Sequence, residues 1–369
     1  MGKHTIDELH QWQALPLSVK IRMTKERIRN WINEFGEDGV YVSFSGGKDS
    51  TVLLDLVRQA YPSARAMFVD VPTQYPELKQ FVMTFQNVDI VKPKISFAQV
   101  CEKYGFPLIS KEVANCVSGA RKYVKYLDSQ KSNKTMLTDR QFQCLQIGVI
   151  PSGSEFRLRR LNGELTDSKG NYSQFNQEKY KFFLDAPFEI SEKCCDVMKK
   201  NPAHKYERET GRKPFIATMA TESSLRAKKW MQEGCNAFEA KHPHSKPMTF
   251  WTEQDVLLYI KENNLPICSV YGEVVTDYES MGQCEDQMSL ADFGIFDKKK
   301  TLLKTTGCQR TGCVLCGFGC HLEKESRFEL LKQTHPKFHN LLYILKNNGV
   351  TYAEAIDWVN EHGGFNIKY

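Results

Sequence analysis

The sequence predicts an α/β protein built on a parallel sheet, and three observations support this class. Val40 to Phe44 is a short apolar run of β-branched and aromatic residues, as in a buried strand, and Thr51 to Arg58 carries leucines and valines as a packed helix does. Ala64 to Val71 is a second strand of this kind, and a strand-helix-strand unit of this length is most simply a right-handed parallel crossover. Further buried strands are predicted at 88–91 and 215–219.

Apolar periodicity predicts the other elements of the first half. Residues 1–36 carry leucine, valine, isoleucine and tryptophan at helical spacings, which indicates one or two amphipathic helices before the sheet. A helix is predicted at 97–104, and a long basic helix is expected to end near Leu127. From 129 to 181 the pattern weakens and Gly, Ser and other polar residues dominate 161–177, so we expect an insertion there rather than sheet.

Helices dominate the predicted second half. Thr221 is a good N-cap for one helix, and Thr252 opens another that ends near Asn264. After Glu323 we expect two helices, roughly 326–346 and 351–362. The predicted organisation therefore has four parts: N-terminal helices at 1–36, a nucleotide-binding α/β domain at 37–240 with an insertion at about 129–181, a helix and cysteine-rich region at 241–325, and C-terminal helices at 326–369.

The corner between the first strand and its helix is a predicted phosphate site. It reads Ser45-Gly46-Gly47-Lys48-Asp49-Ser50, and two glycines at a strand-to-helix turn leave backbone N–H groups pointing outward beside the positive end of the helix dipole. The Lys48 ammonium and the hydroxyls of Ser45 and Ser50 add further donors for a polyphosphate. A bare Gly-Gly pair is as often only a tight turn, and the Gly-x4-Gly-Lys-Ser/Thr spacing of the common mononucleotide loop is absent.

Composition narrows the class of protein. The chain has 369 residues, of which 41% are hydrophobic and 25% charged, and it is long enough for a sizeable core. No apolar run approaches the ~20 residues that cross a bilayer, so we expect a cytoplasmic protein without membrane partners. The net charge of +6 permits a nucleic-acid substrate without requiring one. Twelve cysteines in such a chain indicate metal or redox chemistry rather than disulfides.

The cysteines form one dense motif and one adjacent pair. Within TGCQRTGCVLCGFGCH, glycines let a loop wrap around a metal so that thiolates converge, and the spacing fits zinc as well as a four-iron four-sulfur cluster. The pair lies upstream, in EKCCDVMKKNP. The candidate ligands are Cys194, Cys195, Cys308, Cys313, Cys316 and Cys320.

The hexapeptide resembles the PP-loop of the ATP pyrophosphatases. This group includes the phosphoadenosine phosphosulfate (PAPS) reductase family, the small subunit of ATP sulfurylase, and enzymes that thiolate DNA or tRNA. The resemblance implies a doubly wound, mostly parallel sheet with flanking helices, of the adenine nucleotide α-hydrolase type, followed here by a cysteine-rich and helical C-terminal part. It also implies that residues 45–50 bind ATP, or the related nucleotides adenylylsulfate (APS) or PAPS, together with Mg²⁺.

Two later segments resemble motifs of the same family. Asp70 ends the second strand and precedes a Thr-containing loop that closes with Pro76-Glu77, which implies a role in nucleotide or Mg²⁺ binding. Glu222-Ser223-x-x-Arg226 resembles the segment whose arginine contacts the nucleotide, although Ala217-Thr218-Met219 replaces the usual Gly-x-Arg before it. By this resemblance Lys48, Asp49 and Arg226 are the catalytic candidates.

The cysteine pair resembles the Cys-Cys-x-x-x-Lys segment of APS reductases, where it joins a later Gly-Cys-x-x-Cys to hold a four-iron cluster. The resemblance makes Cys194, Cys195, Cys313 and Cys316 the first choice of ligands, with Cys308 and Cys320 as rivals and zinc as the alternative metal.

Three functions are consistent with these motifs. The first is adenylation with pyrophosphate release, coupled to sulfur transfer from a donor protein or thiol. The second is reduction of APS or PAPS to sulfite, which the cysteine pair favours; the family's tail cysteine is not found after Cys320, although Cys320 beside His321 is a substitute nucleophile. The third is a nucleotide-binding regulator without turnover. The motifs leave the acceptor open among small sulfate esters, tRNA and DNA.

Overall fold

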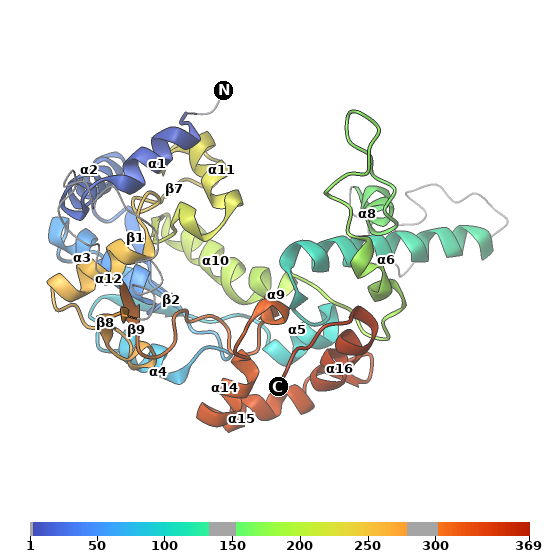
Figure 1. The fold of residues 1–369 in the computed structure, drawn as a ribbon. Coiled ribbons are helices and arrows are strands. Elements are labelled where there is room, and N and C mark those ends of the chain that lie inside the picture. The colour runs from blue at the N-terminus through green and yellow to red at the C-terminus, as the bar shows by residue number, and fades with distance from the viewer. Residues whose placement is uncertain (1–2, 133–152, 279–301) are drawn as a thin grey trace. The chain divides into compact units, whose positions relative to one another are not determined.

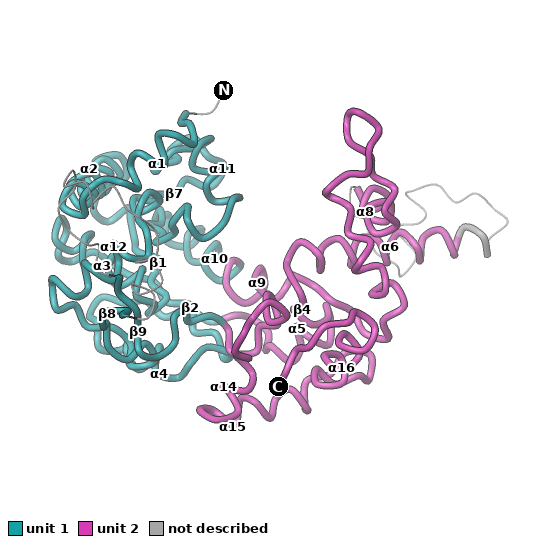
Figure 2. The backbone as a smooth tube through the Cα atoms, viewed as in Figure 1, with its two compact units in different colours: residues 1–92, 201–312 teal, residues 93–200, 313–369 magenta. Residues whose placement is uncertain are grey.

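The computed structural model describes residues 3–132, 153–278 and 302–369 of the chain. The chain forms two compact units, each built from two separate stretches: residues 1–92 with 201–312, and residues 93–200 with 313–369 (Figure 2). We call them the sheet unit and the cysteine unit, after the features that they contain. The four consecutive parts predicted from the sequence divide the chain differently from these two units, and they stay a prediction.

The sheet unit contains the central sheet and the helices that cover it (Figure 1). Its helices and short helical turns are α1 (Ile6–Ala14), α2 (Leu17–Phe35), α3 (Lys48–Ala60), α4 (Pro76–Val82), α10 (Asn201–Thr210), η3 (Ala220–Glu222), α11 (Ser224–Glu233), α12 (Glu253–Glu262) and η4 (Ser269–Tyr271). Its strands are β1 (Val40–Ser43), β2 (Ala66–Val69), β3 (Val88–Val91), β5 (Lys213–Ile216), β6 (Asn236–Ala237), β7 (His244–Ser245), β8 (Val274–Thr276) and β9 (Leu303–Thr305).

The central sheet has the strand order β3-β2-β1-β5-β7-β6. All neighbours are parallel except β6 and β7, which pair antiparallel. The chain adds β2 and β3 on one side of β1 and then returns to add β5 on the other side. The doubly wound, mostly parallel sheet that the family resemblance implied is therefore confirmed, with its change of direction between β1 and β5.

Side chains alternate between the two covered faces of the sheet. Val42 and Phe68 belong to the larger core, which also contains buried residues of α2, α3 and α12. Tyr41 and Met67, one position away on the same strands, pack with Tyr206 of α10. This period of two is what strands buried on both faces require.

One strand lies two residues earlier than predicted. The prediction was 215–219, whereas β5 spans Lys213–Ile216 and includes Pro214. Proline lacks an N–H, but β5 meets β7 only at Phe215 and Ser245, so no partner on that side needs a donor from Pro214. The strand predicted at 88–91 and the helix predicted at 97–104 lie where expected.

The cysteine unit is mainly helical. Its helices and turns are α5 (Phe97–Tyr104), α6 (Lys111–Ser132), α8 (Ser154–Leu161), η1 (Glu178–Asp185), α9 (Lys193–Cys195), the π-helical turn η2 (Asp196–Lys200), η6 (Cys320–Leu322), α14 (Arg327–Thr334), α15 (Pro336–His339), η7 (Asn340–Tyr343) and α16 (Tyr352–Gly363). Its strands are β4 (Leu108–Ile109), β10 (Gly317–Phe318), β11 (Lys346–Asn347) and β12 (Val350–Thr351).

Two predictions for this unit need comment. The single helix expected at 326–346 is wrong: α14 ends at Thr334 and a new turn starts at Pro336, because proline cannot continue the hydrogen bonding of a helix but fits its first turn. Of the insertion predicted at 129–181, residues 133–152 lie outside the described part, and 154–161 form α8.

Among the described residues, no helix has the length and apolar character needed to cross a membrane.

Candidate functional site

The sheet's change of direction positions the predicted phosphate loop. The loops that follow β1 and β5 both leave the carboxyl edge of the sheet, and they diverge because the chain winds in opposite directions from these strands. In open α/β sheets, ligands bind in the crevice at such a point. Residues 45–50 follow β1 and residues 217–223 follow β5, so two of the predicted motifs meet at this edge.

The loop after β1 is a tight turn that its own side chains hold. Gly46 has φ of 74°, and a Cβ there would lie 3.0 Å from a Val82 methyl and 3.2 Å from the Leu78 carbonyl oxygen. Ser50 Oγ donates to the Gly47 carbonyl at 2.9 Å and lies 3.0 Å from Ser45 Oγ. Gly47 is the N-cap of α3 and offers no side-chain cap, so the helix start faces outward.

Lys48 is buried at the base of the site, with 4% of its surface exposed. Its ammonium pairs with the Glu253 carboxylate at 2.8 Å and donates to the Gln309 carbonyl. Its backbone N–H donates to Tyr271 Oη at 3.3 Å. A buried ammonium is stable only when it is paired in this way, so these partners fix the charge at the phosphate loop.

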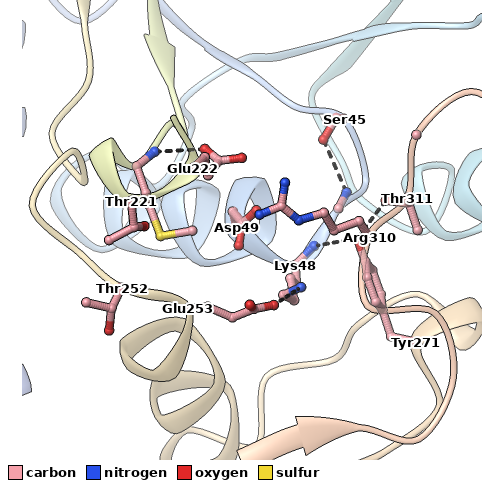
Figure 3. Close-up of a pocket in the computed structure, with 13 residues that line it drawn as sticks. Ser45, Lys48, Asp49, Thr221, Glu222, Thr252, Glu253, Tyr271, Arg310 and Thr311 are labelled. Atoms are coloured by element: carbon pink, nitrogen blue, oxygen red, sulfur yellow. Dashed lines mark hydrogen bonds and ion pairs between the residues drawn. The ribbon is translucent and has the colours of Figure 1, made fainter. Parts of the chain in front are cut away.

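Asp49 is a half-buried carboxylate beside Lys48. Burial raises its pKa, and the positive charges of Lys48, Arg310 and Arg226 oppose this rise. Its Oδ1 has no hydrogen-bond partner within the described residues. Arg310 forms no hydrogen bond or ion pair with any described residue, and its guanidinium extends toward Asp49 (Figure 3). Both groups are therefore available to a ligand.

The segment after β5 supplies a second carboxylate. Glu222 accepts a hydrogen bond of 3.1 Å from the Met219 backbone N–H and forms an ion pair with Arg226. Ser223 caps α11 by accepting from the Arg226 backbone N–H at 3.3 Å. The prediction that Thr221 caps this helix is wrong, because the bond between Glu222 and Met219 closes a separate turn over Ala220–Glu222 first.

Glu253 reaches the site from the start of α12. Thr252 caps this helix in a reciprocal arrangement with Asp255. Asp255 also pairs with the buried ammonium of Lys20, at 2.7 Å, which ties the start of α12 to α2. This anchoring directs Glu253 toward Lys48.

These groups surround one pocket of about 380 Å³, within the usual range for a small-molecule site (Figure 3). The sequence predicted only part of its lining. The pocket is lined by Ser45, Gly47, Lys48, Asp49, Met219, Thr221, Glu222, Thr252, Glu253, Tyr271, Arg310, Thr311 and Gly312. The residues that were not among the predicted site residues are Met219, Thr221, Thr252, Glu253, Tyr271, Arg310, Thr311 and Gly312.

Asp70 and Arg226, two predicted site residues, are not among the residues that line the pocket. Asp70 follows β2 and forms an ion pair of 2.7 Å with Lys79. Arg226 acts on the pocket through its ion pair with Glu222. The nucleotide roles assigned to them by resemblance stay predictions.

We expect Tyr271→Phe to weaken binding of adenine nucleotides about tenfold. The Tyr271 hydroxyl accepts from the Lys48 backbone N–H and shares a 2.6 Å hydrogen bond with Thr311, so it joins the phosphate loop to residues 309–312. Loss of such a buried partner costs about 1–3 kcal/mol. Calorimetric titration with ATP measures the change, and the exposed Tyr278→Phe is the control. Equal affinities for the two variants would contradict the role of this hydroxyl.

Four of the candidate cysteines gather in the cysteine unit. Cys194 interacts electrostatically with Cys195, Cys316 and Cys313. The pKa of Cys195 is lowered to about 5, first by a hydrogen bond with the Cys194 thiol and then by the charges of Lys111 and Lys199. Burial of Cys195 acts in the opposite direction. Burial acts to lower the pKa of Lys199, but the sulfurs of Cys313 and Cys195 outweigh this effect, so the pKa of Lys199 is raised. The charges around Cys195 therefore favour its thiolate.

Strand pairing brings the two cysteine segments into the same unit. β10 follows Cys316 directly and pairs parallel with β4, with Gly317 opposite Leu108. Only glycine fits there, because a Cβ at Gly317 would lie 2.6 Å from the Tyr352 hydroxyl and 2.8 Å from the Pro107 carbonyl oxygen. Arg327 donates to the Cys316 carbonyl at 2.8 Å and holds this turn in place.

The two rival cysteines have other surroundings. Cys308 belongs to the sheet unit, where its sulfur lies 3.7 Å from the Tyr75 hydroxyl. Cys320 is buried in the cysteine unit, and its thiol donates to the Gly317 carbonyl at 2.9 Å. Burial raises the pKa of Cys320 to about 12. Cys320 nevertheless interacts electrostatically with Cys316.

The spacing of the sulfurs bears on which group they fit. Tetrahedral zinc with bonds of about 2.3 Å holds its sulfur ligands roughly 3.8 Å apart. Within the described residues, no three cysteine sulfurs lie within 4.8 Å of one another. A four-iron cluster needs a wider set, because each thiolate binds a different iron atom.

A comparison with the curated proteins found no match. Among solved structures, the PAPS reductase from Candida auris, in its phosphate complex, is similar over 75% of this chain and 97% of its own, with 13% identity and a TM-score of 0.32. The sequence model of the phosphoadenosine phosphosulfate reductase domain matches residues 39–140 and 159–317, which is more than half of the chain. This match includes the phosphate loop and the cysteines from 194 to 316, and it shows that the chain belongs to the phosphoadenosine phosphosulfate reductase family.

Proposed function

We propose that the chain is an enzyme that adenylates a substrate with Mg²⁺-ATP, releases pyrophosphate, and then transfers sulfur to the activated substrate. The observation that carries this proposal is the pocket at the sheet's change of direction. It combines the N-terminus of α3, the buried Lys48 and the unpaired Arg310 with the half-buried Asp49. An anion with several phosphates and its metal ion fits this set of groups.

Charge balance at the pocket favours a nucleotide that carries a divalent cation. Lys48 already pairs with Glu253, and Glu222 pairs with Arg226, which leaves Asp49 facing Arg310. The lining therefore has no excess of positive charge to neutralise a polyphosphate. Mg²⁺ would supply it, and Asp49, whose Oδ1 lacks a partner among the described residues, is the oxygen ligand best placed to hold the ion.

In the proposed first step, an oxygen of the substrate attacks the α-phosphorus of ATP. The new O–P bond forms as the bond to the β-phosphate oxygen breaks, and pyrophosphate leaves. Negative charge grows on the phosphate oxygens, where Lys48, Arg310 and the N–H groups at the start of α3 stabilise it. In the second step, hydrosulfide from a donor displaces AMP, so that a C–S bond replaces the activated C–O bond.

Cys194, Cys195, Cys313 and Cys316 would hold a four-iron four-sulfur cluster. When bound, the cluster supplies iron-sulfur chemistry for handling sulfur or electrons. The residues of this chain provide its setting: Lys111 and Lys199 lower the pKa of Cys195 and so favour the thiolate form that iron requires. Two further expectations stay part of the proposal, namely a sulfur donor protein or thiol reductant and a nucleic-acid acceptor.

Reduction of APS or PAPS to sulfite is the second candidate function. The gathering of Cys194, Cys195, Cys313 and Cys316 favours it, since the resemblance to APS reductases rests on these residues. The surroundings of Cys320 oppose it, because a buried thiol bonded to the Gly317 carbonyl is a poor nucleophile. The balanced charge of the pocket also suits Mg²⁺-ATP better than a nucleotide sulfate without metal.

Anaerobic incubation of the full chain tests both candidates. One set of reactions contains ATP and Mg²⁺, with and without tRNA or single-stranded DNA, and pyrophosphate is measured. The other contains APS or PAPS with a thiol reductant, and sulfite is measured. Pyrophosphate release supports adenylation. Sulfite without pyrophosphate would replace the first proposal with the second.

We expect Asp49→Asn to remove the Mg²⁺ dependence of ATP binding and to stabilise the protein without ligand. Burial raises the pKa of Asp49, so the folded state holds its proton more tightly than the unfolded state does. That contribution to stability is present at low pH and is lost as pH rises through the folded pKa. Asparagine does not ionise, so the variant does not lose this stability as pH rises. The thermal midpoint of Asp49→Asn should therefore exceed that of the wild type at pH 7 and approach the wild-type value at pH 4. A lower midpoint at pH 7 would contradict this assignment.

A further inference from the structure

A group of metal-ligating side chains lies on α10 and on the loop between β6 and β7, both in the sheet unit. His204 and Glu207 are on α10, three residues apart and therefore on one face of the helix. His242 lies in the loop just before β7. One ligand atom from each of the three residues lies within 4.8 Å of the other two. None of the three lines the nucleotide pocket.

The positions of these atoms are close to those of a metal site. His204 Nδ1 is 3.1 Å from Glu207 Oε2, and the centroids of the His204 and His242 rings are 5.1 Å apart. Tetrahedral zinc with bonds of about 2.1 Å separates its ligand atoms by roughly 3.4 Å. His204 is half-buried and His242 is exposed.

The neighbouring residues orient two of the three ligands. Tyr41 Oη donates to Glu207 Oε1 at 2.9 Å, which leaves Oε2 directed at the histidines. His244 Nδ1 donates to the His242 carbonyl at 2.8 Å and fixes the backbone of the loop. Hydrogen bonds to the second oxygen of a carboxylate ligand are typical support for a bound metal.

The hydrogen bond between His204 and Glu207 accounts for the positions of these two side chains, but not for the position of His242. The His242 side chain makes no hydrogen bond to a described residue, and its one recorded contact is with the His204 ring. Two imidazoles that face each other beside a carboxylate repel when both are protonated, whereas as neutral rings they are ligands for the same ion.

We propose that His204, Glu207 and His242 bind a divalent transition-metal ion of the Zn²⁺ or Ni²⁺ class. Two imidazoles and one carboxylate suit these ions and leave a coordination position for water. The ion ties the β6–β7 loop, at the edge of the sheet, to the helix that covers one of its faces. This site is separate from the cysteines in the donor atoms that it offers, so it binds its metal without thiolate.

Calorimetric titration of the full chain with Ni²⁺, after removal of any histidine tag, tests the proposal. Ni²⁺ is the probe because imidazole binds it well, whereas thiolates prefer softer ions. We expect His242→Ala and Glu207→Gln each to weaken one site by at least tenfold, and Tyr41→Phe to weaken it about 10- to 100-fold. His10→Ala, which removes an exposed histidine of α1, is the matched control and should bind as the wild type does.

Two further measurements distinguish the loss of Ni²⁺ binding in a variant from a loss of folding. X-ray absorption of the Ni²⁺-loaded wild type should show nitrogen and oxygen neighbours, and Ni²⁺ should raise the thermal midpoint of the wild type and of His10→Ala but not of His242→Ala. Sulfur neighbours, or equal Ni²⁺ binding by His242→Ala and His10→Ala, would overturn the proposal.

Discussion

Lys48→Ala is expected to reduce nucleotide turnover on the order of 100- to 1,000-fold, the loss that follows removal of one preorganised group that stabilises transition-state charge. The Lys48 ammonium is 4% exposed and lies between Glu253 and residues 309–312. Its position is therefore set before any ligand arrives. The Arg310 guanidinium is directed toward Asp49 (Figure 3), so it does not take the place of the Lys48 ammonium.

The same substitution should leave the cysteines unaffected. Lys48 is in the sheet unit, whereas Cys194, Cys195, Cys313 and Cys316 are in the cysteine unit. Iron content and visible absorption should therefore match the wild type while turnover is lost. Pyrophosphate or sulfite release, whichever activity the wild type shows, is the measurement. Lys261→Ala, an exposed change on α12, is the control, and turnover by Lys48→Ala at the control's rate would remove Lys48 from the mechanism.

The part of the site that could be predicted from the sequence is the part that is local in the chain. Residues 45–50 combine a strand, two glycines and a helix start within a few positions, and each feature has a physical meaning without the fold. The same is true of the strand at 88–91 and the helix at 97–104, whose apolar spacing is enough to define them. Glu222, which also lines the pocket, was predicted through the resemblance of residues 222–226 to a segment of the family.

The residues that were missed reach the pocket through contacts distant in the chain. Tyr271 and Lys48 are 223 positions apart, and the sequence around Tyr271 has no motif that indicates a nucleotide. Arg310 lies between Cys308 and Cys313, where the spacing indicates a metal, so the cysteines concealed its place in the pocket. Glu253 looked like an ordinary first-turn acid of a capped helix, and only the packing of α12 directs it toward Lys48.

The choice among six cysteines was open for a similar reason. Spacing alone gave Cys308 and Cys320 the same standing as Cys313 and Cys316. The division of the chain into two units separates Cys308 from the rest, and the pairing of β10 with β4 brings residues 313–316 into the unit of Cys194 and Cys195. Long-range strand pairing of only two residues leaves no periodic signal in a sequence.

Cys195→Ser is expected to remove the proposed iron-sulfur cluster almost completely. Serine keeps the size and the hydrogen bonding of the side chain, but its hydroxyl does not ionise near pH 7 and binds iron poorly. Cys195 has the lowered pKa of a ligand thiol, held by the Cys194 hydrogen bond and by Lys111 and Lys199, so it is the most informative position to change. Iron and acid-labile sulfide per chain, measured after anaerobic purification, should fall at least tenfold.

Substitutions of the rival cysteines give this experiment its internal comparison. Cys308→Ser changes a thiol beside the Tyr75 hydroxyl in the sheet unit, and Cys320→Ser changes one bonded to the Gly317 carbonyl, so both should keep the iron and sulfide of the wild type. Cys194→Ser, Cys313→Ser and Cys316→Ser should lose them as Cys195→Ser does. Iron that survives in Cys195→Ser but not in Cys308→Ser would move the ligand set to the other unit. Zinc without acid-labile sulfide in the wild type would end the proposed cluster assignment, since a four-iron cluster contains both iron and sulfide.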